Sequence, residues 1–332
     1  MALQSTTRVR VGLVALIGIA LVLSGCGIRN RREFQELTRR QVQGQGGARV
    51  ASSSSSHATS LAPVEYKVKV VKDIQYYKGP DADPKKSKLD LYLPEGLDSF
   101  PVLHFVHGGA WTMGDKDQSV PLLGSYKKLG TAFAREGIGV VISNYRLSPK
   151  VKHPTHIRDV AAAWAWIYRN IATHGGRTNE MFVMGQSAGG HLAALLTMNR
   201  KYLDVLGVPS NSIRGLIAMS GIYDVKMSKE KGKAPSMITK AFGNDPAVWK
   251  AASPLMYVRR GLPPVLVLTA ERDPMVLRIQ GEQLSVALKQ KNVETDFIIL
   301  PGKNHFNEVG DIGKKGDLAT AEIVSFIRSN LR

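Results

Sequence analysis

One eight-residue stretch constrains the fold of this chain more than any other. It reads M-G-Q-S-A-G-G-H from Met184 to His191, between an apolar run typical of a strand and an alanine- and leucine-rich run typical of a helix. The pattern G-x-S-x-G needs a strand-to-helix turn so sharp that the hydroxyl of Ser187 stands clear of the backbone. Ser187 is therefore a candidate nucleophile. Because so short a pattern also occurs by chance, the interpretation depends on what the rest of the chain supplies.

A serine nucleophile needs a base, and the base needs an acid to orient it. His305 follows the last predicted strand in P-G-K-N-H-F, and Asp273 follows another predicted strand in A-E-R-D-P. The order Ser187, Asp273, His305 is the order found in α/β-hydrolases. Asp224, which also follows a strand, and the weaker candidate Glu271 remain as alternatives for the acid.

The reaction also needs donors for the oxyanion that forms at the attacked carbonyl. The sequence H-G-G-A-W follows a predicted strand, and its glycines would let backbone N–H groups approach a substrate oxygen closely. We expect Gly108, Gly109 and the N–H of Ala188, next after the nucleophile, to form the oxyanion hole. Trp111, at the end of the same loop, is a candidate for substrate contact.

Strand-like and helix-like runs alternate from residue 102 onward, and this alternation predicts a mostly parallel sheet with helices on both faces. Two earlier runs at 66–70 and 89–93 alternate apolar with polar residues, and we expect antiparallel edge strands there. A lysine-rich insert at 225–254 interrupts the pattern between two core strands. It is either a lid or pocket wall, or a surface excursion. The expected strands are 102–106, 139–143, 181–184, 213–219, 265–269 and 296–300, and the helices are 125–136, 157–171, 188–198, 275–291 and 318–331.

The N-terminus has the three-part form of a secretory signal peptide over residues 1–25. Two arginines precede an apolar stretch that is too short to span a bilayer comfortably, and L-S-G-C follows. L-S-G-C resembles the lipobox of bacterial lipoproteins, which implies cleavage before Cys26 and its lipidation. An uncleaved anchor, or a plain signal with a chance cysteine, is the alternative. Residues 26–63 have the composition of a flexible linker, and the folded body is expected at 64–332.

This N-terminus predicts an exported protein tethered by lipid to a bacterial envelope membrane. Gly27, rather than an aspartate, follows Cys26, which favours the outer membrane where the cell has one. The net charge of +18 is spread along the chain with no aromatic-interleaved basic block, so no nucleic-acid partner is expected. A single cysteine excludes an internal disulfide and a cysteine-based metal site.

The other histidines have structural interpretations. His104 lies inside a strand, His107 would shape the glycine-rich loop, and His191 would pack or hydrogen-bond behind the nucleophile. His153 and His156 lie near Asp159, but their spacing matches no standard ligand set, so we expect no metal.

Together these motifs resemble the hormone-sensitive-lipase-like esterases of the α/β-hydrolase superfamily. Within that group the chain is most similar to the bacterial feruloyl-esterase-like, arylformamidase-like and isoprenylcysteine-methylesterase-like branch, over residues 64–332. The resemblance implies Ser187 as nucleophile, His305 as base and Asp273, which precedes Pro274 as in the family motif, as acid. It also implies Gly108, Gly109 and Ala188 as oxyanion donors. One departure is Ala110, where lipases of the group often have a third glycine. The motifs are His107-Gly108-Gly109, Asn144-Tyr145-Arg146-Leu147-Ser148-Pro149, Gly185-Gln186-Ser187-Ala188-Gly189-Gly190-His191 and Asp273-Pro274-Met275-Val276.

The expected function is that of a serine carboxylesterase acting on a small-molecule ester through an acyl-enzyme, with no metal or nucleotide cofactor. An arylformamidase-like hydrolase of amides or formamides uses the same triad and remains an alternative. A catalytically silent binding module on the cell surface is another. The natural substrate and the oligomeric state do not follow from the sequence.

Overall fold

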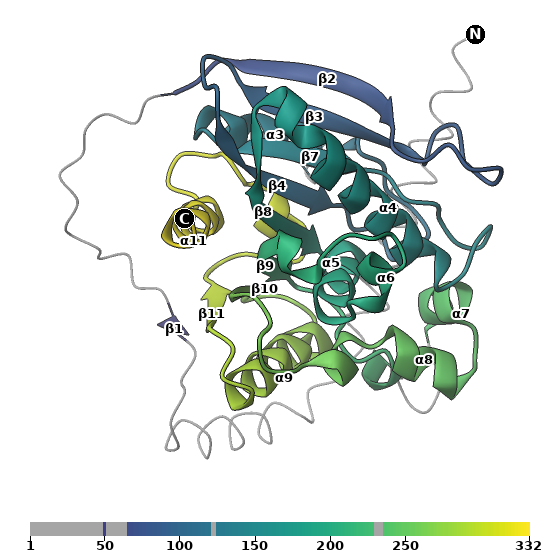
Figure 1. Ribbon diagram of the computed structural model, residues 1–332. Coiled ribbons are helices and arrows are strands. Elements are labelled where there is room, and N and C mark those ends of the chain that lie inside the picture. The colour runs from purple at the N-terminus through teal and green to yellow at the C-terminus, as the bar shows by residue number, and fades with distance from the viewer. Residues whose placement is uncertain (1–48, 51–64, 121–123, 229–234) are drawn as a thin grey trace, which may run out of the picture.

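The computed structural model describes residues 49–50, 65–120, 124–228 and 235–332. Their centre is a nine-stranded sheet with the strand order β1-β11-β10-β9-β8-β4-β7-β3-β2 (Figure 1). Two further short strands, β5 (Ser119–Val120) and β6 (Gly124–Ser125), pair separately. The sheet strands are β1 (Arg49–Val50), β2 (Val68–Gln75), β3 (Lys88–Pro94), β4 (Phe100–Val106), β7 (Gly139–Ser143), β8 (Gly176–Gln186), β9 (Ile213–Met219), β10 (Val265–Ala270) and β11 (Thr295–Leu300).

The strands run parallel from β11 to β7, and β3 pairs antiparallel with both β7 and β2. The predicted mostly parallel α/β sheet is confirmed, and so is the antiparallel direction of the two leading strands. The prediction that both are edge strands was wrong for β3, which lies between β2 and β7. Asp90 and Tyr92, which alternate with the leucines of β3, are buried as well. Asp90 accepts from the Lys116 ammonium at 2.9 Å, and Tyr92 packs in the core.

Helices cover both faces of the sheet (Figure 1). Helices α4, α5, α7, α8 and α9 contribute to one apolar core, and α3 and α11 contribute to the other. Strands covered on both sides are continuous apolar runs, as in G-V-V-I-S of β7. The helices are α3 (Tyr126–Arg135), α4 (Thr155–Asn170), α5 (Ala188–Met198), α6 (Lys201–Asp204), α7 (Ser236–Phe242), α8 (Pro246–Ala252), α9 (Met275–Gln290), α10 (Asn307–Gly310) and α11 (Leu318–Ser329), with 3₁₀ turns η1 (Ile171–His174), η2 (Ser210–Ser212), η3 (Lys226–Ser228) and η4 (Pro254–Tyr257).

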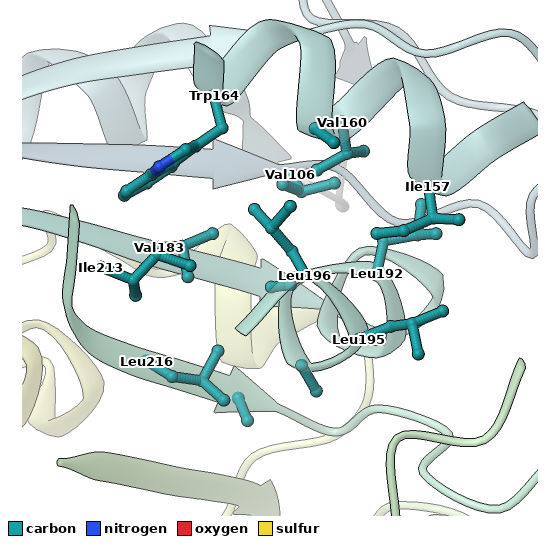
Figure 2. Close-up of a cluster of buried hydrophobic side chains, with 14 of the residues drawn as sticks. Val106, Ile157, Val160, Trp164, Val183, Leu192, Leu195, Leu196, Ile213 and Leu216 are labelled. Atoms are coloured by element: carbon teal, nitrogen blue, oxygen red, sulfur yellow. The ribbon is translucent and has the colours of Figure 1, made fainter. Parts of the chain in front are cut away.

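Helix α5, which follows the candidate nucleophile, is buried along its whole length. Figure 2 shows Leu192, Leu195 and Leu196 of this helix among apolar side chains of the neighbouring strands and of α4. Because such a core is close-packed, the helix has little freedom to shift. The start of α5, where the nucleophile lies, is therefore fixed by the apolar core. The other labelled side chains are Val106, Ile157, Val160, Trp164, Val183, Ile213 and Leu216.

The insert at 225–254 contains helices α7 and α8. Ile238, Phe242 and Trp249 are buried in the same core as α5. The Phe242 ring lies 4.8 Å from that of Trp111, in the glycine-rich loop. This anchoring argues against a surface excursion, and the role of the insert as a lid or pocket wall stays a prediction.

Two sequence expectations concern the N-terminal segment. The predicted signal peptide and Cys26 lie outside the described residues. Arg49–Val50, within the predicted linker, pairs in parallel with Ile298 and Ile299 of β11. Among the helices of the described ranges, none has the length and apolar character needed to cross a bilayer.

Candidate active site

Ser187 occupies a strained turn between β8 and α5. Its backbone has φ 58° and ψ −120°, a left-handed conformation that few residues other than glycine adopt. The turn is held because the Ser187 N–H donates to the Met219 carbonyl at 2.9 Å and the His191 N–H donates to the Ser187 carbonyl at 3.0 Å. The strand before the turn and the helix after it therefore fix the direction of the hydroxyl.

Two glycines allow this turn to pack against its neighbours. A Cβ on Gly185 would lie 2.1 Å from the Gly189 carbonyl oxygen. A Cβ on Gly189 would lie 2.0 Å from the carbonyl oxygen of Val106, at the end of β4. Both distances are far below van der Waals contact, so the G-x-S-x-G spacing is a steric requirement of this turn.

The loops after β10 and β11 bring an acid and a base to Ser187. His305 Nε2 lies 3.0 Å from Ser187 Oγ, and His305 Nδ1–H donates to Asp273 Oδ1 at 2.8 Å. With its Nδ1 proton held by the carboxylate, the imidazole presents the lone pair of Nε2 to the serine hydroxyl. The sequence-predicted nucleophile, base and acid thus form one hydrogen-bonded chain at the carboxyl ends of parallel strands.

The two alternative acids have other partners. Asp224 accepts from a backbone N–H of its own loop at 2.9 Å, and its own N–H donates to Gln280 Oε1 at 2.7 Å. Glu271 is exposed and accepts from the Gly302 N–H at 2.6 Å. Of the three predicted acids, Asp273 is the one that contacts His305.

Two opposing effects set the pKa of His305. Burial lowers it, but the charge and hydrogen bond of Asp273 outweigh burial and hold the pKa above its usual value. A protonated His305 would therefore be stabilised by its surroundings. Neutral imidazole is the form that accepts a proton, so base catalysis requires a pH above this raised value.

Three polar residues that the sequence interpretation did not assign lie behind the triad. Ser220 Oγ donates to Asp273 Oδ2 and lies 2.6 Å from Glu308 Oε2. Gln186 Nε2 donates to Glu308 Oε1 at 2.9 Å and to the His305 carbonyl at 2.7 Å. Ser220 follows directly after β9, and this position at the end of a core strand was the one available signal. Asp273, His305 and Glu308 are also close enough to ligate a metal, but each has hydrogen-bond partners within this network.

The glycine-rich loop packs directly against the Ser187 turn. A Cβ on Gly108 would lie 2.6 Å from Gln186 Oε1 and 3.4 Å from Ser187 Cβ. Gly109 has φ +112°, where a side chain is strained, and a Cβ there would lie 2.2 Å from a carbonyl of the same loop. Ala188 is the first residue of α5, where an N–H has no intrahelical acceptor. The predicted oxyanion donors thus lie on two segments that meet beside Ser187.

His107 shapes this loop, as its sequence position suggested. Its Nδ1 donates to the Gly108 carbonyl at 2.7 Å, and its ring stacks on Tyr145 at 4.4 Å. The Tyr145 hydroxyl donates back to the His107 carbonyl at 3.1 Å. These contacts fix the backbone immediately before the expected oxyanion donors.

Trp111 does not occupy the position expected of a substrate contact. Its indole is 1% exposed, packs against Phe242 and His191, and donates Nε1–H to His191 Nδ1 at 3.2 Å. His191 in turn donates Nε2–H to the Ala252 carbonyl at 2.7 Å. We therefore assign Trp111 to packing that joins the glycine-rich loop to α5 and the insert.

Among the remaining histidines, His104 and His156 each hydrogen-bond to a serine outside this site. His104 pairs with Ser143 Oγ at 2.7 Å, and His156 pairs with Ser148 Oγ at 3.0 Å. Asp159 instead accepts two hydrogen bonds from the guanidinium of Arg146, at 2.7 and 2.9 Å.

Buried neutral histidines should make the protein sensitive to mild acid. Burial lowers the pKa of His107 to about 4 and that of His104, His156 and His191 to about 3. Below about pH 6.5 the unfolded chain binds protons at these histidines that the folded protein does not bind. The free energy of unfolding is therefore unaffected by them above that pH and falls as the pH decreases. At pH 5 each histidine lowers the free energy of unfolding by ~2 kcal/mol, and the four together lower it by ~8 kcal/mol. The whole free energy of unfolding of a typical domain is about 5–15 kcal/mol.

We therefore expect the urea midpoint, followed by circular dichroism, to fall steeply between pH 7 and pH 5. His305 and Glu308 work in the opposite direction because the pKa of each is raised, but they are two groups against the four histidines. A midpoint at pH 5 equal to that at pH 7 would contradict this expectation.

The parallel sheet, the nucleophile turn and the loops after β10 and β11 define an α/β-hydrolase. A family model described as BD-FAE matches residues 89–288, and the chain belongs to that family. The relatives confirm the predicted resemblance to the hormone-sensitive-lipase-like esterase group.

Curated relatives include two esterases of Mycobacterium tuberculosis. Esterase LipQ is 35% identical over 217 residues, which is 62% of this chain and 50% of its own length. Esterase LipC is 31% identical over 234 residues, which is 67% of this chain and 56% of its own length. The isoprenylcysteine alpha-carbonyl methylesterase ICME of Arabidopsis thaliana is 27% identical over 246 residues, which is 67% of this chain and 54% of its own length. The chain spans about half the length of the curated relatives it matches.

Solved structures agree with the fold. Esterase B from Lactobacillus rhamnosis superposes with a TM-score of 0.65 at 20% identity, covering 96% of each chain. A structure described as bacterial heroin esterase superposes with a TM-score of 0.64 at 23% identity, covering 91% of each chain.

Proposed function

We propose that the chain is a serine carboxylesterase that hydrolyses a small-molecule carboxylic ester through an acyl-enzyme. The observation that carries the proposal is the hydrogen-bonded chain from Ser187 through His305 to Asp273, which lies beside a glycine-rich loop. The names of the relatives, which are esterases and carboxylic ester hydrolases, agree with this chemistry.

In the acylation step His305 Nε2 accepts the proton of the Ser187 hydroxyl as Oγ attacks the ester carbonyl. The carbonyl oxygen becomes an oxyanion, to which the N–H groups of Gly108, Gly109 and Ala188 donate. His305, now imidazolium, keeps its Nδ1–H on Asp273 and gives its Nε2 proton to the leaving alkoxide.

The second step reverses these roles with water in place of the alcohol. Neutral His305 accepts a proton from a water molecule, whose oxygen attacks the acyl carbon. The proton then returns to Ser187 Oγ as the C–O bond to the enzyme breaks and the carboxylic acid leaves. Each proton transfer uses Nε2, so the tautomer held by Asp273 serves both steps.

A comparison of ester and formamide substrates tests the proposed reaction class. We expect the full chain to turn over p-nitrophenyl acetate with a kcat/KM well above its value for an N-formyl arylamine. The leaving alkoxide of an ester needs less protonation than the leaving amine of a formamide, so we expect a Ser-His-Asp triad to favour esters. A higher kcat/KM for the N-formyl compound would replace the esterase proposal with the formamidase one. Turnover of neither by folded protein would support the silent binding module.

We also propose that the protein is exported and held by lipid on Cys26, from the L-S-G-C sequence that precedes it. In an expression host with a lipoprotein pathway, Cys26→Ala should move the enzyme from the membrane fraction to the soluble fraction and abolish its labelling by radioactive palmitate. The exposed Ser325→Ala variant on α11 is the matched control and should remain labelled. Unchanged labelling of the Cys26 variant would refute the anchor.

A further inference from the structure

Two buried carboxyl groups lie behind His305, although a serine triad requires one. Asp273 Oδ1 is 2.8 Å from His305 Nδ1, and Glu308 Oε1 is 3.7 Å from the same atom. Both acidic side chains are 0% exposed. Ser220 Oγ lies between them, within hydrogen-bond distance of Asp273 Oδ2 and 2.6 Å from Glu308 Oε2.

The number of protons available at Ser220 limits the charge of this group. A hydroxyl has one proton, so Ser220 can donate to only one of the two carboxyl oxygens that it contacts. The other contact is a hydrogen bond only if the carboxyl group carries a proton and donates it to Ser220 Oγ. If both carboxyl groups were ionised, Ser220 Oγ would contact one carboxylate oxygen with no proton between the two atoms, which is unfavourable in a buried site. One of the two acids is therefore protonated.

The surrounding donors identify which acid is ionised. Asp273 Oδ1 accepts from His305, while Oδ2 accepts from Ser220 and from the Ala270 N–H at 3.2 Å. Donors directed at both oxygens are the environment of a carboxylate. Asp273 is therefore the ionised member of the pair.

Glu308 has the environment of a carboxylic acid. Gln186 Nε2 donates to Glu308 Oε1 at 2.9 Å, and the same nitrogen donates to the His305 carbonyl, which fixes the orientation of the amide. Oε1 is thus the carbonyl oxygen, and Oε2, which faces Ser220, is free to hold the proton. Burial, followed by the charge of Asp273, raises the pKa of Glu308 to about 8, against the opposing effect of His305 and the hydrogen bonds of Ser220 and Gln186.

The other titratable groups near this site do not supply a compensating cation. Tyr223 lies near both acids, and burial, together with the charge of Asp273, raises the pKa of its phenol. Helix α3 also packs against α10, the helix that contains Glu308; its Tyr126 is buried and its Lys127 and Lys128 are exposed.

We propose that Glu308 is a neutral positioning residue, which donates its carboxyl proton to Ser220 so that Ser220 donates its own proton to Asp273. The arrangement holds a single negative charge between the two acids and directs it at His305 Nδ1. Ionised Glu308 would compete with Asp273 for the Nδ1 proton and would lower the availability of His305 as a base. This role rests on the proposed triad mechanism, because Glu308 acts through Asp273 and touches no reacting atom.

A pair of variants tests the positioning role. Glu308→Leu removes both hydrogen bonds, so we expect kcat to fall while KM changes little. Glu308→Gln keeps them, because its amide oxygen can accept from Gln186 and its amide nitrogen can donate to Ser220; we expect it to recover most of the lost kcat. If Glu308→Gln is as damaged as Asp273→Asn, Glu308 acts as an ionised acid and the proposal fails. If Glu308→Leu retains full kcat, the proposal fails as well.

Infrared spectroscopy tests the proton directly and does not depend on catalysis. Difference spectra between the Ser187→Ala protein and the same protein with Glu308→Gln should show, at pH 7, a carboxylic acid C=O band that belongs to Glu308. The band should disappear as the pH rises through about 8. A carboxylate signal for Glu308 at pH 7 overturns the proposal even if esterase activity is found, while the acid band would stand even if the esterase proposal failed.

Discussion

Replacing Ser187 with alanine should reduce kcat for ester hydrolysis by about a millionfold, the loss seen when a triad nucleophile is removed. The substitution deletes the atom that attacks the carbonyl, and no other hydroxyl lies within hydrogen-bond distance of His305 Nε2 among the described contacts. The turn should survive, because it is held by backbone hydrogen bonds to Met219 and His191 rather than by the hydroxyl. Stopped-assay kinetics with a p-nitrophenyl ester, together with the urea midpoint, measure both effects.

Ser325→Ala, an exposed serine on α11, is the control and should keep its activity. Substantial ester hydrolysis by a folded Ser187→Ala protein would mean that another group attacks the substrate. The turn at Ser187 would then have only a structural role, and the assignment of the reaction class would fail.

Replacing Asp273 with asparagine should lower kcat by about ten-thousandfold. Asparagine removes the charge that stabilises the imidazolium and can present N–H to His305 Nδ1, which would place the imidazole proton on Nε2, facing Ser187. The nucleophile then has no acceptor for its proton. The ester assay used for Ser187→Ala measures the loss.

Asp224→Asn is the matched control, because Asp224 also follows a core strand but hydrogen-bonds to Lys226 and Gln280 rather than to His305. We expect a change of no more than a few-fold. If Asp224→Asn lost more activity than Asp273→Asn, the acid of the triad would be misassigned.

Much of the fold follows from local patterns that the sequence displays openly. Continuous apolar runs predicted the parallel strands, and the periodic segments predicted α4, α5, α9 and α11 within a few residues of their observed ends. The strand-to-helix turn at Ser187 was predictable because both flanking glycines are required sterically: a Cβ at Gly185 or Gly189 would clash with backbone oxygens.

What could not be predicted depends on pairs of residues far apart in the chain. Ser220 and Glu308 are 88 residues apart and belong to no short motif, so their contact appears only when the strands are assembled. The run 89–93 was expected at a sheet edge, because nothing in the sequence links its Asp90 to Lys116. Trp111 was expected to contact the substrate. In the structure Ala110 and Trp111 have positive φ angles of 52° and 58°, and the indole packs beside His191 instead.

The central claim is that Ser187 forms a covalent bond to the substrate's acyl group. Incubation of the full chain with a p-nitrophenyl alkylphosphonate should release one equivalent of p-nitrophenol as activity is lost, because Ser187 Oγ would attack phosphorus as it attacks an ester carbonyl. Peptide mass spectrometry should then find a single phosphonyl group on Ser187, and none in the Asp273→Asn protein after the same time. Modification of a different residue, or an active enzyme that remains unlabelled, would contradict the account.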